Sequence, residues 1–95
     1  MVLEVALIDV LPGQEAQFTA AYRDAREILA TTPGCQGVRM TQGVESPSRF
    51  VLLVEWDSIA AHTGNFRATE RFTAWRALIG PFFAQPPVVE HFADI

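Results

Sequence analysis

Two segments of the chain are apolar on both of the faces that a β-strand presents. In residues 2–10, alternate positions place Val2, Ala6, Ile8 and Val10 on one face and Leu3, Val5 and Leu7 on the other. In residues 49–56, the first face carries Phe50, Leu52, Val54 and Trp56, and the second carries Val51 and Leu53. A sheet built from such strands must be covered on both sides, which is the strongest constraint that the sequence places on the fold.

The segments around these strands predict two helices and two more strands. Residues 14–30 carry larger apolar side chains at helical spacing, and Pro33 and Gly34 follow this helix. In residues 35–44, more and less apolar side chains alternate as in a strand with one solvent-exposed face. A short loop joins this segment to residues 49–56 as a hairpin.

A second helical region is predicted from a cap at Asp57 or Ser58 to about Ile79, with a break near Gly64. Its expected apolar stripe consists of Phe72, Trp75, Leu78 and Ile79. Gly80 and Pro81 end this helix, and a last strand is expected after Pro86 and Pro87.

The predicted order is strand, helix, strand, strand, helix, strand, within one domain over residues 1–95. This is the ferredoxin-like βαββαβ pattern, an α+β fold with an antiparallel sheet and both helices on one face. Because the other face is also apolar, we expect a homodimer in which two sheets face each other as a dimeric α/β barrel.

Composition excludes several classes of partner and of site. The net charge is -4 and the basic residues are scattered, which argues against nucleic acid as a ligand. No apolar run approaches the ~20 residues that span a membrane, so no membrane partner is expected. Glu4 and Asp9 near the start do not fit an export signal, and with Cys35 as the single cysteine they favour a cytoplasmic location. No motif predicts a metal or a nucleotide cofactor.

Several short motifs, in this order and spacing, resemble the antibiotic biosynthesis monooxygenase family of small dimeric α+β barrels. They are the PG after the first strand, PGCQG after the helix, RFVLLVEWDS, and RFTAW followed by Gly80-Pro81. The resemblance covers nearly the whole chain. It implies the fold more firmly than the activity, because the family includes quinone-forming oxygenases that use no cofactor, haem-degrading enzymes and proteins of unknown activity.

The resemblance implies a pocket whose lining differs from that of the quinone-forming members. Trp56 and Arg76 occupy the family's tryptophan and arginine positions, whereas Leu52 replaces an asparagine and His62 replaces a tyrosine. We predict His62 as a base, because an imidazole titrates near neutral pH, and Arg76 as the holder of a developing oxyanion. Trp56 is the expected stacking wall, and the other expected substrate contacts are Leu52, Phe66 and Phe72.

The implied reaction is oxidation of an anthrone, a quinol or a similar aromatic compound to a quinone by O₂, without a cofactor. Each site residue also has a structural alternative, since Trp56 could be core, His62 a hydrogen-bonded structural histidine and Arg76 a surface arginine. A second interpretation is a dimer that binds a small molecule without catalysis. Haem binding or degradation is a weaker third, because neither Ala6 nor the region of Trp75 and Arg76 supplies the imidazole that this branch uses.

Overall fold

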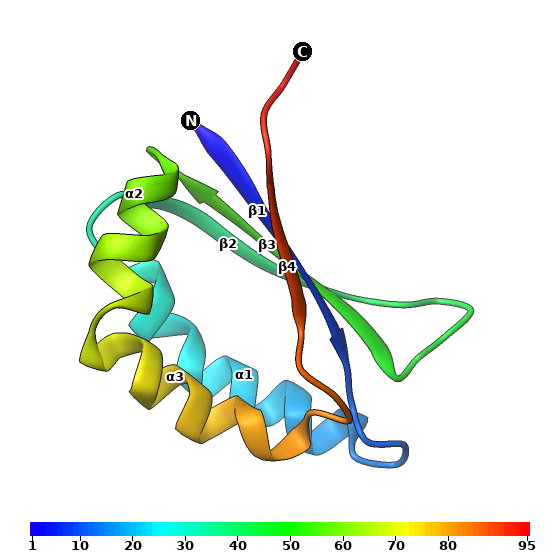
Figure 1. Ribbon diagram of the computed structural model, residues 1–95. Coiled ribbons are helices and arrows are strands. Elements are labelled where there is room, and N and C mark those ends of the chain that lie inside the picture. The colour runs from blue at the N-terminus through cyan, green and yellow to red at the C-terminus, as the bar shows by residue number, and fades with distance from the viewer.

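One antiparallel sheet and a layer of helices make up the computed structural model, which describes all 95 residues (Figure 1). The elements in chain order are β1 (Val2–Asp9), α1 (Glu15–Ala30), β2 (Cys35–Gln42), β3 (Arg49–Trp56), α2 (Ile59–His62), the π-helical turn η1 (Thr63–Arg67), α3 (Glu70–Ile79), the 3₁₀ turn η2 (Gly80–Phe82) and β4 (Val88–Phe92). The strand order β2-β3-β1-β4 is that of the ferredoxin-like fold and confirms the predicted fold class.

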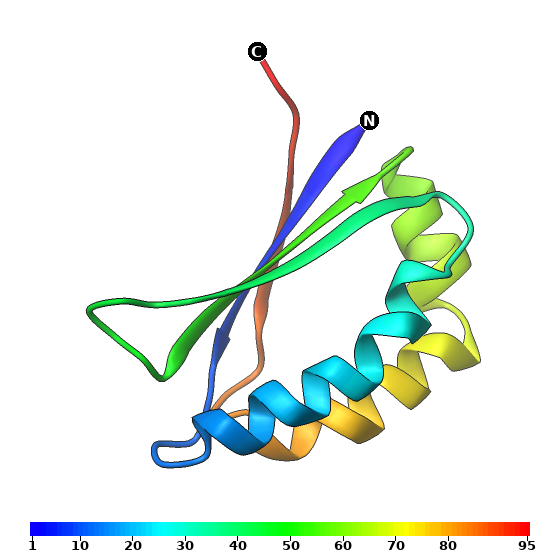
Figure 2. The same cartoon turned by 180° about the vertical axis from the view of Figure 1, so that it is seen from behind.

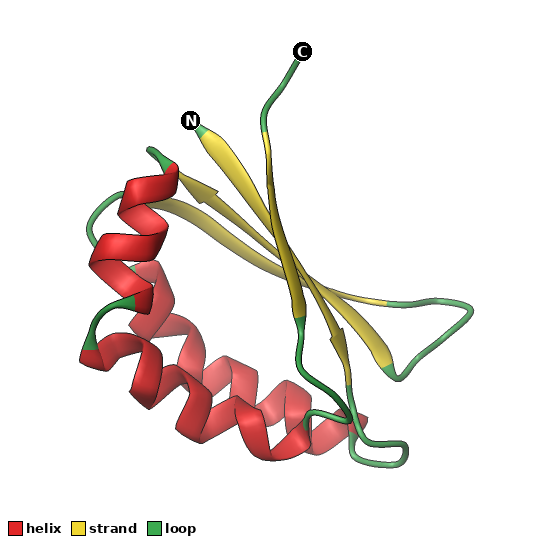
Figure 3. Ribbon diagram, viewed as in Figure 1, coloured by secondary structure: helices red, strands yellow, loops and turns green.

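All the helices lie on one side of the sheet, as the view from behind also shows (Figure 2) and as the colouring by secondary structure makes plain (Figure 3). The amphipathic pattern of α1 explains its place, because its buried residues Phe18, Tyr22, Ala25 and Leu29 follow helical spacing. The ring of Phe18 packs 4.7 Å from that of Phe50 on β3, measured between centroids. These contacts tie α1 to the covered face of the sheet.

The second helical region differs from the prediction in two places. The helix does not break at Gly64, which lies inside η1. The N–H of Ala68 donates to the carbonyl of Thr63, five positions earlier, at 3.0 Å, and the chain turns at Ala68 and Thr69. Leu78 was wrongly assigned to the buried stripe. It is 40 % exposed, because the face of α3 that meets the sheet runs through Trp75 and Ile79 and the adjacent Leu78 is rotated away from it.

The sheet face opposite the helices is covered by no other part of the chain (Figure 3). Val5 pairs with Leu53 on β3, and Leu3 pairs with Phe92 on β4, so apolar side chains run across this face. Leu7, Val88 and Phe92 are between 46 % and 53 % exposed. The predicted apolar second face is therefore present in the structure.

No helix in the chain combines the length and the apolar character that crossing a membrane requires.

Candidate functional site

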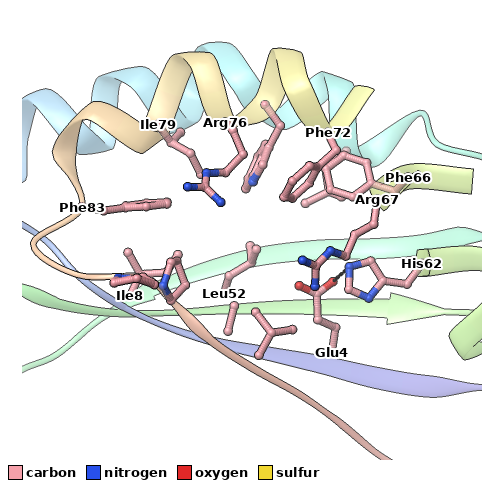
Figure 4. A pocket seen from close by; sticks show the side chains of 16 residues that line it. Glu4, Ile8, Leu52, His62, Phe66, Arg67, Phe72, Arg76, Ile79 and Phe83 are labelled. Atoms are coloured by element: carbon pink, nitrogen blue, oxygen red, sulfur yellow. Dashed lines mark ion pairs between the residues drawn. The ribbon is translucent and has the colours of Figure 1, made fainter. Parts of the chain in front are cut away.

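A cavity of about 370 Å³ lies between the covered face of the sheet and α3 (Figure 4). Its floor comes from β1 and β3 through Ala6, Ile8 and Leu52, and its roof from α3 through Phe72 and Ile79. A volume of this size suits a small organic molecule. Most of the lining is apolar, and the polar groups gather at two ends.

The first polar end is a chain of polar side chains in contact, mostly buried, from four different elements. The indole N–H of Trp56 on β3 donates to Oε1 of Glu4 on β1 at 2.9 Å. The same oxygen lies 3.3 Å from Nε2 of His62 on α2. On the other side of the ring, Nδ1 of His62 lies 2.7 Å from Nε2 of His91 on β4. Glu4 and His62 are only 5 % and 3 % exposed, whereas His91 is partly exposed, so the carboxylate and the first imidazole have little contact with bulk water.

Strand pairing, a helix cap and ring stacking bring these groups together. Glu4 and His91 are direct partners in the pairing of β1 with β4. The Ser58 side chain caps α2 by accepting from the N–H of Ala61 at 3.1 Å, which sets the start of the helix that carries His62. The His62 ring stacks on the indole of Trp56, with 5.1 Å between ring centroids and 17° between planes. The imidazole is therefore held by packing as well as by hydrogen bonds.

Burial decides the ionisation of this network. Loss of solvation is the main cause that lowers the pKa of His62 to about 4, and the electrostatic influence of His91 and Arg67 contributes to the same shift. Burial raises the pKa of Glu4, although the Trp56 hydrogen bond and the charge of Arg67 act against this rise. Although Glu4 and His62 lie at ion-pair distance, His62 is neutral at neutral pH, so the contact joins a carboxyl group to a neutral imidazole.

The second polar end is the guanidinium of Arg76, which lines the cavity near Phe83 (Figure 4). Its Cζ atom lies 5.3 Å from the centre of the Phe83 ring and 5.7 Å from that of Phe72. Arg76 makes no hydrogen bond or ion pair within the protein, so its N–H groups are free to meet a ligand. Arg67, on η1, lies nearer to Glu4 and places its Cζ 5.2 Å from the centre of the Phe72 ring.

Five of the six predicted site residues line this cavity: Leu52, His62, Phe66, Phe72 and Arg76. Trp56 does not line it. The Trp56 side chain is fully buried behind His62, so its indole face meets the imidazole and its N–H meets Glu4. The expected contact between Trp56 and a substrate ring is thus replaced by a supporting contact to His62.

Sequence reasoning missed Glu4 and Arg67 as site residues and treated His91 only as a core or interface residue. A signal for Glu4 was present, because it lies between Val2 and Ala6 on the strand face that becomes buried. A carboxylate on a core face has a large desolvation cost, which marks it as a candidate functional group. Arg67 carried no such signal, because its approach to the cavity depends on the wide turn of η1.

The chain matches the family model "Antibiotic biosynthesis monooxygenase" over residues 1–78. It is 34 % identical to the uncharacterized protein YczJ of Bacillus subtilis (strain 168), over the full length of both chains. A crystal structure from Bordetella bronchiseptica, of a protein ascribed to the same family, superposes with a TM-score of 0.95 at 38 % identity, covering 99 % of this chain and 96 % of that one. A mutant of SnoaB from Streptomyces nogalater, a cofactor-independent oxygenase, has a TM-score of 0.83 at 16 % identity, with 98 % and 91 % covered, which is a likeness of fold.

Proposed function

Because the chain belongs to the antibiotic biosynthesis monooxygenase family, we propose that it is a cofactor-independent oxygenase of an aromatic, polyketide-type substrate such as an anthrone or a quinol. In this reaction the substrate loses a proton, and the resulting anion is oxidised by O₂. For an anthrone, one oxygen atom enters the ring as the new quinone carbonyl and the other leaves as water. The protein must supply a water-poor pocket and a route for the proton.

The observation that carries the proposal is the cavity itself, which joins an apolar middle to a buried acid–base network at one end. The walls at Ile8, Leu52 and Phe72 suit a flat aromatic molecule. The Glu4–His62 contact at 3.3 Å offers a place where a substrate hydroxyl can lose its proton. Arg76 supplies the positive charge that the substrate anion requires at the other end.

A second candidate is a dimer that binds a small molecule without transforming it. Leu52 favours this function, because it lies at the position of a polar residue in the quinone-forming members and offers no hydrogen bond to a substrate oxygen. Haem has less support, because both nitrogens of the only imidazole that lines the cavity face protein groups.

The proposed assembly is a homodimer through the open sheet face. Its centre is apolar, and charges of both signs lie on the same face, with Arg39 on β2, Glu55 on β3 and Glu90 on β4. A face of this kind is self-complementary across a two-fold axis, since each basic group can meet an acidic group of the other copy. We therefore propose a second copy of the chain as its occupant.

Oxygen consumption with a panel of anthrones and dihydroxynaphthalenes tests the proposed activity. We expect uptake above the spontaneous rate, and we expect His62→Ala and Arg76→Ala each to lower it by at least about tenfold. Ile59→Ala on α2 and Leu78→Ala on α3 are matched controls, because both side chains are exposed neighbours outside the cavity. Unchanged turnover in both site variants would remove the site assignment, and no uptake with any substrate would favour the binding function.

A further inference from the structure

Both ring nitrogens of His62 are occupied inside the protein. Nε2 faces Glu4 at 3.3 Å and Nδ1 faces His91 at 2.7 Å. A neutral imidazole has one N–H donor and one acceptor nitrogen, so a proton on Nε2, which faces the carboxylate, leaves Nδ1 as the acceptor of the hydrogen bond with His91. Although ring atoms of His62 line the cavity, neither nitrogen can receive a substrate proton unless one of these contacts breaks.

The carboxylate of Glu4 differs in this respect. Its Oε1 takes both contacts, one from Trp56 and one from His62, while Oε2 makes no hydrogen bond. No fully buried polar side-chain atom of the protein lacks a partner, so Oε2 is open to the cavity that Glu4 lines. Figure 4 shows this carboxylate at the cavity, between the side chains of His62 and Arg67.

The surroundings of Glu4 hold the carboxylate in one orientation. The indole of Trp56 and the ring of His62 meet Oε1 and stack on each other. His91, the direct strand partner of Glu4, fixes the far side of the His62 ring. With one oxygen fixed on the protein side, the other is aimed at the cavity, which is the arrangement that a general base requires.

We propose that Glu4 takes the proton from the substrate bound in this cavity, and that His62 and His91 are positioning residues that hold its carboxylate. This inference rests on the proposed function and deepens it by assigning the proton acceptor. In the step, the O–H bond of a phenol or of an enolised anthrone breaks and its electron pair stays on the substrate oxygen. The proton forms a new O–H bond at Oε2 of Glu4, and the substrate anion is the species that O₂ oxidises.

The electrostatics of the site agree with these roles. Burial raises the pKa of Glu4, which makes its carboxylate a stronger base than an exposed glutamate. Burial also keeps His62 neutral, with its pKa lowered to about 4. The titratable or charged groups around Glu4 come from each element packed against it: Cys35 on β2, His62 on α2, Arg67 on η1 and His91 on β4.

Anaerobic binding of 1,8-dihydroxyanthrone, followed by its absorption spectrum, tests the assignment without requiring oxidation. We expect wild-type protein to bind the probe as its anion. Glu4→Gln keeps the size of the side chain and an acceptor for Trp56, so it should bind the neutral probe, with the anion fraction reduced at least about tenfold. Glu45→Gln removes an exposed carboxylate from the β2–β3 loop, outside both the cavity and the open sheet face, and should match the wild type.

His62→Gln and His91→Gln distinguish positioning from proton transfer. Both variants should still form the probe anion, with the midpoint of its pH dependence shifted, because the carboxylate remains while its support is altered. The assignment is overturned if Glu4→Gln forms the same fraction of anion as the wild type. It is also overturned if His62→Gln abolishes anion formation while Glu4→Gln does not.

Admission of air to the same samples then separates the two proposals. Glu4-dependent anion formation without O₂ uptake would contradict oxygenation and leave the role of Glu4 standing.

Nitrogen NMR of the imidazoles in the ligand-free protein provides a second test that does not depend on any probe. We expect the two nitrogens of His62 to show one protonated and one acceptor signal, with no titration between about pH 5.5 and 8. A His62 ring that titrates in this range would have a nitrogen available as a base and would overturn the proposal.

Discussion

Glu4 and His62 bring two ionisable groups into the interior, and their effects on stability have opposite signs. The folded protein binds a proton at His62 less readily than the unfolded chain does, because the pKa falls from 6.5 to about 4 on folding. The free energy of unfolding therefore falls as the pH drops through this range. The raised pKa of Glu4 acts the other way. The unfolded chain ionises first as the pH rises above 4.5, so this glutamate lowers stability toward neutral pH.

The contribution of His62 can be isolated by comparing the pH dependence of two proteins. Between pH 7 and pH 5 we expect the wild type to lose up to about 2 kcal/mol more unfolding free energy than His62→Gln, which cannot be protonated in the unfolded chain. Urea unfolding at the two pH values measures both differences. Equal pH dependence in the two proteins would show that the folded state does not hold His62 in its neutral form.

Gly34 and Gly13 form a second residue-scale comparison. Both have positive φ, 90° and 87°, but a Cβ at Gly34 would lie 2.6 Å from the Cβ of Ala61, whereas a Cβ at Gly13 meets nothing within 4 Å. We expect Gly13→Ala to lower the free energy of unfolding by about 1 kcal/mol, the conformational cost alone. Gly34→Ala should lower it by roughly 2 to 4 kcal/mol, because the loop must also move away from α2. Urea denaturation measures both, and equal losses would contradict the close contact.

At the scale of elements, α2 has the least support of its own and a large role in the site. Four residues cannot form a stable helix alone, so α2 depends on its cap and on packing. Its continuation through η1 brings the adjacent residues Phe66 and Arg67 to the same cavity. The Phe66 ring lies 6.2 Å from both Trp56 and Trp75, and so links this segment to the sheet and to α3.

The cap of α2 gives a direct prediction. Ser58→Ala removes the side-chain oxygen that accepts from the N–H of Ala61, and should lower the free energy of unfolding by about 1 kcal/mol. Ser46→Ala is the matched control, because this exposed serine in the β2–β3 loop makes no side-chain hydrogen bond. Thermal or urea unfolding gives both values. A loss at Ser46 as large as that at Ser58 would remove the cap as the cause.

At the scale of the whole molecule, the two faces of the sheet differ in burial. The covered face forms one cluster of 15 buried apolar residues with the helices. The open face leaves Leu7 and Phe92 about half exposed, at 46 % and 50 %. Water contact over such a face is unfavourable at roughly 25 cal/mol for each Å² of apolar area, so its burial against a second copy would contribute to assembly.

Light scattering at micromolar concentration tests this assembly. We expect wild type to have the mass of a dimer and Leu53→Asp, at the centre of the open face, to have the mass of a monomer. Val44→Asp is the control, because Val44 is an apolar residue with 89 % exposure that lies in the β2–β3 loop, away from the sheet. A monomeric wild type would contradict the dimer, as would a dimeric Leu53→Asp.

The sequence by itself determined the order of the elements and which strand faces are apolar, because alternation and helical spacing are local patterns. The Val2–Ala6–Ile8 face and the α1 stripe through Phe18 and Leu29 follow directly from such patterns. Family resemblance brought Leu52, His62 and Arg76 into one expected pocket, and the structure brings them to one cavity. Leu78 was misassigned because the buried face of α3 runs through Trp75 and Ile79, and the break expected near Gly64 lies instead at Ala68 and Thr69, because η1 continues the helical chain past this glycine.

Only the tertiary structure decided the chemistry at the polar end of the cavity. Glu4, His62 and His91 come from three elements far apart in the chain, and their contacts depend on strand register and on the turn that carries His62. The sequence could indicate that an imidazole was available, but not that both of its nitrogens would be used. It could not indicate that Trp56 would support this ring from behind. A hydrogen-bond network is defined by distances of a few tenths of an ångström, which no local pattern of residues specifies.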